Sequence, residues 1–90
     1  MIMNIEEISK ISKALSEPKR IEILLLTSKK EMCANDILER FEITQPTLSH
    51  HMKQLTDCNI IKVRKDGKMS NYSLNKDKLN EYLDYFKNIN

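Results

Sequence analysis

The sequence predicts a mainly α-helical domain that carries one small β-hairpin. Proline and glycine are scarce, with two and one among 90 residues, which favours helices over a loop-rich or all-β domain. Apolar residues recur at helical spacing over most of the chain, and an Asp-Gly pair at 66–67 separates two runs of β-type pattern. The length and a hydrophobic content of 40% suit one core, so we expect a single domain over residues 1–90.

The first two helices follow from apolar spacing and from helix-start signals. Branched apolar residues recur every three or four positions over residues 4–15, and Asn4 is the expected N-cap. The second helix begins with Ser16 as its cap and Pro18 in its first turn, and it runs to about Ser28. Its dense apolar content predicts a helix that is buried on most sides.

Two further helices follow, separated by a short turn. The third is expected over about Ala34–Phe41, and residues 42–44 are too few for anything but a turn. The fourth, over 45–57, opens with Thr44 as N-cap and Pro46 in the first turn, where a missing N–H costs nothing. Its predicted buried stripe consists of Leu48, Met52 and Leu55, with His51 at the edge.

The pattern then changes to strands and returns to a helix. Ile60–Arg64 and Met69–Leu74 are β-type runs, and Asp-Gly between such runs is a strong hairpin signal. From Asp77 to Ile89 the apolar residues again follow helical spacing. The predicted order is therefore ααααββα.

Two short helices joined by a tight turn and followed by a hairpin are typical of a winged helix-turn-helix. Opposite its buried stripe, helix 45–57 presents short polar, amide and basic side chains near its N-terminus, as expected of a helix that meets base edges and phosphates. The wing, 62–73, adds a basic turn. We therefore predict that double-stranded DNA contacts Gln45, Pro46, Thr47, Ser49, His50, Lys53, Gln54, Arg64, Lys65 and Lys68.

The distribution of charge points to the same part of the chain. Residues 1–43 carry seven basic and eight acidic side chains, whereas residues 44–72 carry five basic and two acidic ones. Residues 73–90 are balanced at three and three. A positive block of this kind suits a polyanion, although each feature taken alone is also typical of an ordinary solvated surface.

Several function classes are disfavoured by the sequence. No apolar run approaches the ~20 residues of a membrane span, and no basic segment followed by an apolar core marks the N-terminus, so we expect a cytoplasmic protein with no membrane partner. The chain has no glycine-rich phosphate loop and no nucleophile–base pair, so we expect neither an enzyme nor a cofactor. Two cysteines are too few for a disulfide framework.

Three segments resemble the ArsR/SmtB family of small homodimeric bacterial repressors. They are KALSEPKRIEILLL (13–26), TQPTLSHHMKQLTDCNII (44–61) and RKDGKMSNYSL (64–74), of which Ser-His-His in the fourth helix is the most specific part. The resemblance implies a dimer formed by the terminal helices, which matches the two amphipathic segments at the ends of the chain. The expected interface residues are Ile5, Ile8, Leu79, Tyr82, Leu83 and Phe86. From the residues alone, these apolar stripes would equally suit packing on the chain's own core.

Metal-sensing relatives of this family carry Cys-x-Cys just ahead of the third helix, where this chain has EMCANDI. Cys33 aligns with the first cysteine and Asn35 with the second, and one thiol beside a carboxamide gives too few soft ligands. The last helix has no histidine for the family's other site, so we predict no metal site. Cys33 is expected to be a partly buried residue before the third helix, with Asn35 or a neighbour as the cap; Cys58 is expected to be structural.

The sequence thus predicts a sequence-specific DNA-binding regulator, a homodimeric repressor that reads an inverted repeat. Two alternatives stay open at this point. One is a thiol-based redox switch that uses Cys33, alone, across a dimer or paired with Cys58, and the other is a winged-helix module that binds a protein partner. Activation instead of repression is also left open.

Overall fold

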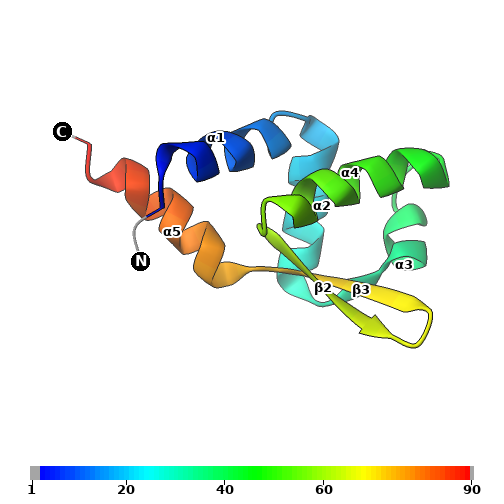
Figure 1. Ribbon diagram of the computed structural model, residues 1–90. Helices are drawn as coiled ribbons and strands as arrows, with labels where there is room; N and C mark the ends of the chain where they lie inside the picture. Colours follow the sequence, from blue (N-terminus) through cyan, green and yellow to red (C-terminus); the bar gives the residue numbers. More distant parts are fainter. Residues whose placement is uncertain (1–2, 90) are drawn as a thin grey trace.

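The computed structural model describes residues 3–89, and over this range the chain forms five helices and one three-stranded antiparallel sheet (Figure 1). The elements in chain order are α1 (Ile5–Ala14), α2 (Pro18–Lys29), β1 (Met32–Cys33), α3 (Ala34–Leu38), α4 (Gln45–Asp57), β2 (Ile61–Asp66), β3 (Met69–Leu74) and α5 (Lys76–Lys87). The mainly α-helical winged helix-turn-helix class is therefore confirmed, and the fourth helix has the predicted bounds.

The predicted order ααααββα lacks one strand. Met32 and Cys33 form β1 and pair with Tyr72 and Asn71 of β3, which gives the sheet the order β1-β3-β2. Two residues are too few to show the alternation that identifies a strand, and both side chains are buried. Because the pairing partner lies about forty residues away, no local pattern could have revealed it.

The helix boundaries correct two local predictions. Asn4 caps α1 as expected, accepting from the Glu7 N–H at 2.8 Å in a reciprocal capping box. Glu17, and not Ser16, is the N-cap of α2, because the Ser16 hydroxyl instead donates to the Lys13 carbonyl at 2.6 Å. The third helix ends at Leu38, three residues before the predicted Phe41.

Burial of α2 is also less complete than predicted. Ile23 and Leu24 are buried, but Ile21 and Leu25 on the same helix remain 43% and 59% exposed. At 3.6 residues per turn, consecutive apolar residues spread over more of the circumference than the core covers.

The core lies where α1–α4 meet the base of the sheet. The fully buried apolar side chains come from all four of these helices and from the start of β2: Ile11, Ile23, Ile37, Leu48, Leu55, Ile60 and Ile61. Ile8 belongs to the same core and is 8% exposed, so this predicted interface residue is already covered within one chain.

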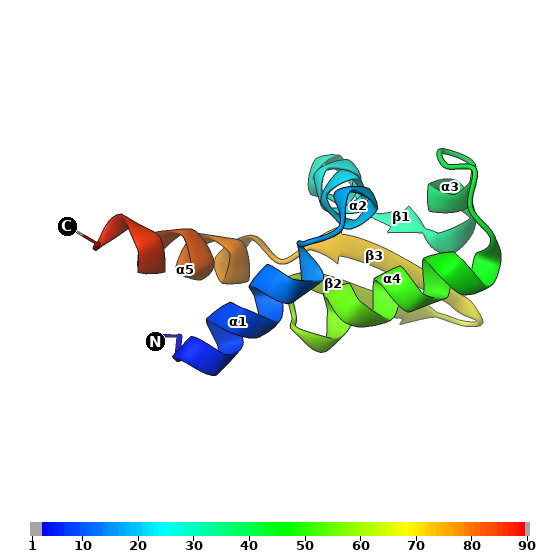
Figure 2. The same cartoon turned by 90° about the horizontal axis from the view of Figure 1, so that it is seen from above.

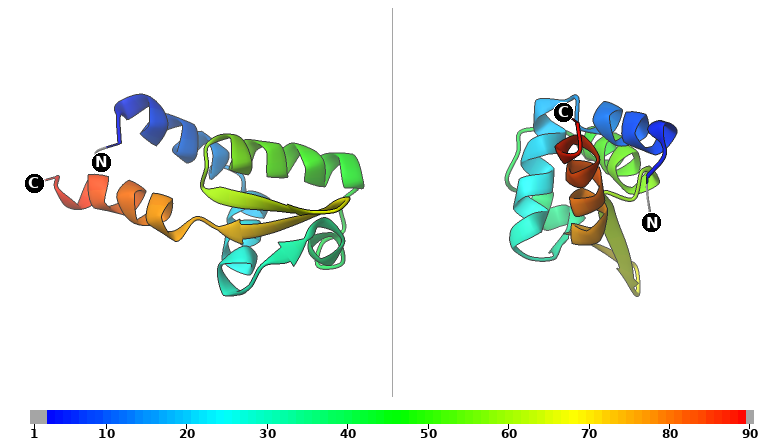
Figure 3. Two further views of the ribbon diagram at one scale, coloured as in Figure 1. Left: turned by 60° about the horizontal axis from the view of Figure 1, so that its bottom comes forward. Right: turned by 90° about the vertical axis from the view of Figure 1, so that its left-hand side faces the viewer.

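The molecule is elongated, measuring 43 × 24 × 21 Å. Helix α5 extends from the body, as Figure 2 shows from above, and none of its twelve described residues is buried. Both ends of the chain lie at this side, and the tip of the β2–β3 hairpin lies at the other (Figure 3). Among residues 3–89 no helix has the length and apolar character needed to cross a membrane.

Candidate nucleic-acid interface

Helix α4 begins with the cap that the sequence predicts. The Thr44 hydroxyl accepts from the Thr47 N–H at 3.3 Å and also bonds to the Thr47 hydroxyl at 2.9 Å. Pro46 lies in the first turn, where a backbone N–H has no acceptor within the helix, so proline loses no hydrogen bond there. The helix therefore starts at a defined residue, and the Thr44 side chain satisfies one of the N–H groups that the first turn leaves without an intrahelical partner.

The two faces of α4 differ sharply in exposure. Leu48, His51, Met52 and Leu55 are buried. The predicted DNA-contacting residues lie on the rest of the surface: Gln45, Pro46, Thr47, Ser49, His50 and Lys53 are exposed, and Gln54 is half-buried. Lys53 is paired with Asp57 one turn later, at 3.1 Å, so one acidic group sits at the far end of this face.

The sequence predicted His51 at the edge of the buried stripe, but the structure shows it to be a core residue. It is 8% exposed, and its Nδ1 accepts a hydrogen bond from Arg20 Nε at 3.0 Å. Arg20, itself 9% exposed, also donates to the Ala14 carbonyl at 3.4 Å. Burial, and then the nearby Arg20 charge, lower the pKa of His51 below its usual value of 6.5. Arg20 thus joins α2 to α4 through a buried hydrogen bond to His51. The sequence alone did not predict this role.

The hairpin has the tight turn that Asp66-Gly67 predicts. Asp66 pairs with Met69, and Gly67 has a φ of +63°, a conformation that suits glycine. Lys65 donates to the Ser70 hydroxyl across the two strands at 2.7 Å. The side chain of Lys68 is exposed, and among residues 3–89 no ion pair involves it.

Arg64 is not a free cation. Its Nη2 and Nε donate to the two carboxylate oxygens of Glu31 at 2.7 and 3.1 Å, in a bidentate pair. The hydrogen bond from Arg64 is the main reason that the pKa of Glu31 is lowered from its ordinary value. The predicted DNA contact of Arg64 therefore competes with a partner that joins the wing to the segment ahead of β1.

A shallow groove of about 260 Å³ runs between α4 and the wing. It is lined by Ser49, Met52, Lys53, Thr56, Val63, Lys65, Ser70 and Tyr72. The structure thus brings Ser49, Lys53 and Lys65 to one surface, as the winged-helix reading predicts. The other predicted DNA-contacting residues lie outside this groove, elsewhere on α4 and along the hairpin.

The predicted interface residues of the terminal helices are mostly available. Ile5, Leu83 and Phe86 are exposed by 73%, 47% and 43%, and Leu79 and Tyr82 are half-buried. The Tyr82 hydroxyl lies 2.7 Å from the Ser12 hydroxyl, which connects α5 to α1. Apart from the buried Ile8, these side chains form an apolar strip on α5 and at the start of α1.

The two cysteines lie on different elements. Cys33 ends β1 and Cys58 follows α4, and both thiols are free and buried. Cys33 itself occupies the N-cap position of α3 without a side-chain bond, so the predicted cap at Asn35 is wrong. Burial raises the pKa of the Cys58 thiol. Within the described range, no three His, Cys, Asp or Glu side chains are grouped to hold a metal ion.

Comparison with known proteins places this architecture in context. Residues 17–63 match the family described as "Bacterial regulatory protein, arsR family". The chain is 51% identical over 83 residues to the arsenical resistance operon repressor of Staphylococcus xylosus, covering 92% of this chain and 76% of that protein.

Solved structures show the same fold. One ArsR family transcriptional regulator superposes with a TM-score of 0.86 at 21% identity, over 97% of this chain and 90% of the other. A homodimeric winged helix-turn-helix DNA-binding domain from Mycobacterium bovis gives 0.78 at 19% identity, over 91% and 77% of the two chains.

Proposed function

Because the chain belongs to the ArsR family of bacterial regulatory proteins, we propose that it is a homodimeric transcriptional repressor that binds specific sequences of double-stranded DNA. The observation that carries the proposal is the exposed polar face on the N-terminal half of α4, which continues into the groove beside the wing. In this role the chain is a single DNA-binding domain with terminal dimerisation helices. It acts in the cytoplasm, without enzymatic activity or a membrane partner.

The chemistry of the exposed face suits the major groove. Gln45 offers an amide that can pair with adenine, and the hydroxyls of Thr47 and Ser49 can donate to or accept from base edges. His50 is exposed beside them and carries both a donor and an acceptor. The N-terminus of α4 and Lys53 favour phosphate oxygens, which position the helix without reading sequence.

The wing supports this contact from the adjacent backbone or minor groove. Lys65 lines the groove beside Ser49 and Lys53, and Lys68 stands at the hairpin turn. Both are lysines, which act on phosphates as compact point charges. We assign them to affinity and assign the face of α4 to specificity.

The dimer is proposed from the apolar strip on α5 and at the start of α1. Isolated chains seldom leave several large apolar side chains exposed on one protruding helix, and such a strip marks a contact surface. A similarly folded Mycobacterium bovis domain is homodimeric. A twofold dimer presents two α4 helices to an inverted repeat, with half-sites about 10–10.5 bp apart.

The signal that releases DNA is a separate question. The similar Staphylococcus xylosus protein is named for arsenical resistance. Soft metals and metalloids need several converging thiolates, whereas this chain has two cysteines, both buried and on separate elements. We therefore propose a repressor without a soft-metal site of its own. Burial of both thiols also counts against the redox-switch alternative.

The deciding experiment is fluorescence anisotropy with DNA from upstream of the protein's own gene and a scrambled duplex of the same composition. At ~50 and ~200 mM salt, a repressor prefers the native duplex, and its affinity falls steeply as salt rises. Equal weak binding of both duplexes, or none at low salt, would favour the protein-interaction alternative. Adding arsenite to the bound complex tests the sensing proposal, and we expect no release.

A further inference from the structure

We propose that Asn75 is a positioning residue that sets the angle between α5 and the DNA-binding body, and thereby the separation of the two α4 helices in the dimer. This inference rests on the proposed function, because it assigns a role to the junction between the wing and the dimerisation helix. Few apolar contacts hold α5 to the rest of the chain.

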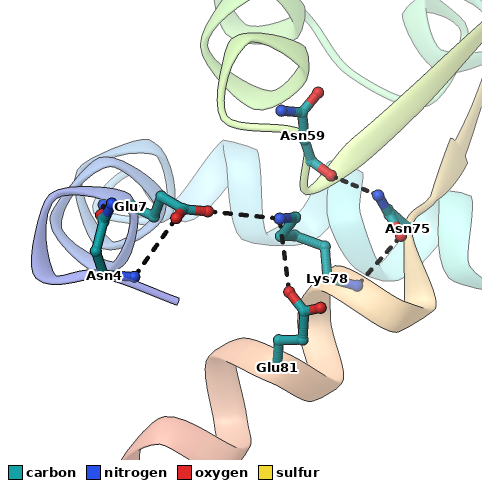
Figure 4. A network of polar contacts seen from close by, with 6 residues as sticks. All are labelled: Asn4, Glu7, Asn59, Asn75, Lys78 and Glu81. Atoms are coloured by element: carbon teal, nitrogen blue, oxygen red, sulfur yellow. Dashed lines mark hydrogen bonds and ion pairs between the residues drawn. The ribbon is translucent and has the colours of Figure 1, made fainter. Parts of the chain in front are cut away.

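Helix α5 does not insert into the core. None of its twelve described residues is buried, and only Leu79, Tyr82 and Tyr85 reach the edge of the core cluster. A helix packed in this way has little apolar contact to fix its direction. Its orientation therefore depends on polar contacts, which lie at its base (Figure 4) and at Tyr82, whose hydroxyl is 2.7 Å from that of Ser12 in α1.

Asn75 makes polar contacts both to α5 and to the segment that follows α4. Its Nδ2 donates to the Asn59 carbonyl at 2.9 Å, and its Oδ1 accepts from the Lys78 N–H at 3.2 Å. Its backbone N–H also donates to the Ile60 carbonyl at 2.9 Å. One carboxamide thus caps α5 with its oxygen and, with its nitrogen, holds Asn59, the second residue after α4.

The other end of this link is rigid. Asn59 has a φ of +64°, and its N–H donates to the Thr56 carbonyl at 3.0 Å, so it closes the C-terminus of α4. The next residue, Ile60, is fully buried. The Asn59 carbonyl is therefore a fixed point on the DNA-binding body, and Asn75 joins α5 to it.

A second contact joins α5 to α1. Lys78 Nζ lies 3.6 Å from a carboxylate oxygen of Glu7 and 3.5 Å from one of Glu81 (Figure 4). Glu7 is held in turn by the capping box with Asn4. Ion pairs between partly exposed groups contribute little and weaken in salt, whereas the Asn75 hydrogen bonds join neutral groups, which salt does not screen. Asn75 is therefore the link expected to dominate.

A small change in the angle of α5 at this junction produces a large displacement at the far end of the helix, and so at the DNA. Twelve helical residues span about 18 Å, so a tilt of ~10° at the base of α5 moves its far end by about 3 Å. That displacement is close to the ~3.4 Å rise of one base pair. If two copies meet through α5, such a tilt shifts the register of the two half-sites by roughly one step.

One of the two side-chain hydrogen bonds of Asn75 can be removed while the other is kept. Asn75→Asp keeps an oxygen that can cap α5, because aspartate is as good an N-cap as asparagine, but it cannot donate to the Asn59 carbonyl. Asn75→Ser is a second variant that keeps a capping hydroxyl on a shorter arm. Lys78→Ala is the matched control, since it removes a neighbouring contact of α5 and leaves Asn75 intact.

The test uses the full chain and duplexes that carry the inverted repeat selected by the wild-type protein, with the spacer unchanged or altered by one or two base pairs. We expect Asn75→Asp and Asn75→Ser to lower the preference for the original spacer by roughly fivefold, the effect of one ordinary hydrogen bond. Binding to a single half-site and the dimer dissociation constant should stay within about twofold of wild type. Lys78→Ala should keep most of the wild-type spacer preference.

Two results would overturn the inference. One is a wild-type spacer profile in both variants, and the other is an equal loss on every duplex, half-site included, which would indicate a purely structural residue. If the wild-type protein selects no sequence at all, the proposed function fails instead. The two failures are therefore distinguishable.

Discussion

The two ends of the molecule are built in opposite ways. At the DNA-binding end, α4 packs four side chains into the core and presents a polar surface that needs no partner within the protein. At the other end, α5 buries no residue and presents apolar side chains instead. One end is complete in a single chain, whereas the other is, in the proposed dimer, half of a shared surface. Variants at the two ends should therefore fail in different ways.

The largest effect is expected at the apolar end. Leu83→Glu should convert the dimer to monomers, because it places a charge where each of two copies would bury a leucine. The free energy of dimerisation should weaken by about 3–6 kcal/mol in all. Sedimentation equilibrium measures the dissociation constant. Leu25→Glu is the matched control, since that leucine is 59% exposed on α2, outside the proposed interface. A folded dimer of Leu83→Glu, or equal dissociation of the control, would contradict the assignment.

Beneath the DNA-binding end, the Arg20–His51 bond should make stability depend on pH. The pKa of His51 is lowered in the folded chain, so its contribution to stability is present above the unfolded value of about 6.5 and is lost as pH falls towards the folded pKa. Urea unfolding at pH 7.5, 6.5 and 5.5 measures this decline.

Two variants sharpen that measurement. His51→Asn cannot titrate and should flatten the dependence below pH 6.5, whatever its effect on absolute stability. Arg20→Met should cost about 1–3 kcal/mol at neutral pH, because it leaves a buried imidazole nitrogen without its donor. The same acid-side slope in wild type and His51→Asn would show that other groups cause it.

On the exposed face of α4, substitutions should change specificity without changing stability. Ser49→Ala and His50→Ala should each cost about 1–3 kcal/mol on the preferred duplex and much less on a scrambled one, because a base contact is lost. Anisotropy with both duplexes provides the ratio, and thermal unfolding provides the control. A uniform loss on both duplexes would reassign the side chain to phosphate contact.

The smallest effects are expected on the wing, where two basic residues should differ. Lys68→Ala should weaken all duplexes alike and lower the slope of affinity against salt by about one. Arg64→Ala should change this slope less, since the guanidinium is engaged by Glu31 at 2.7 Å. Glu31→Gln should release Arg64 and steepen the slope. Equal slopes for the two alanine variants would mean that DNA displaces Glu31.

The sequence predicted what depends on near neighbours. Helical spacing, the Thr44 cap and the Asp66-Gly67 turn are read within a few residues, and they located α4 and the hairpin correctly. Apart from local errors at the Ser16 cap and at the two ends of α3, what it missed depends on distant partners. The β1–β3 pairing, the Arg20–His51 bond and the Arg64–Glu31 pair each join residues more than thirty positions apart. Local sequence patterns carry no information about such contacts. The sequence therefore predicted His51 at the edge of the buried stripe and Arg64 as available to DNA, whereas His51 is buried and Arg64 is paired.

The strand order β1-β3-β2 has one further consequence. Because β2 stands at the end of this order and pairs only with β3, it is an edge strand along its whole length, with unpaired backbone groups that could template another strand. Four of its six residues are charged, in the sequence IKVRKD. Charged side chains oppose the stacking of edge against edge that leads to aggregation. The charges that suit the wing for a polyanion thus also keep neighbouring molecules from joining their sheets, which leaves association to the terminal helices of the proposed dimer.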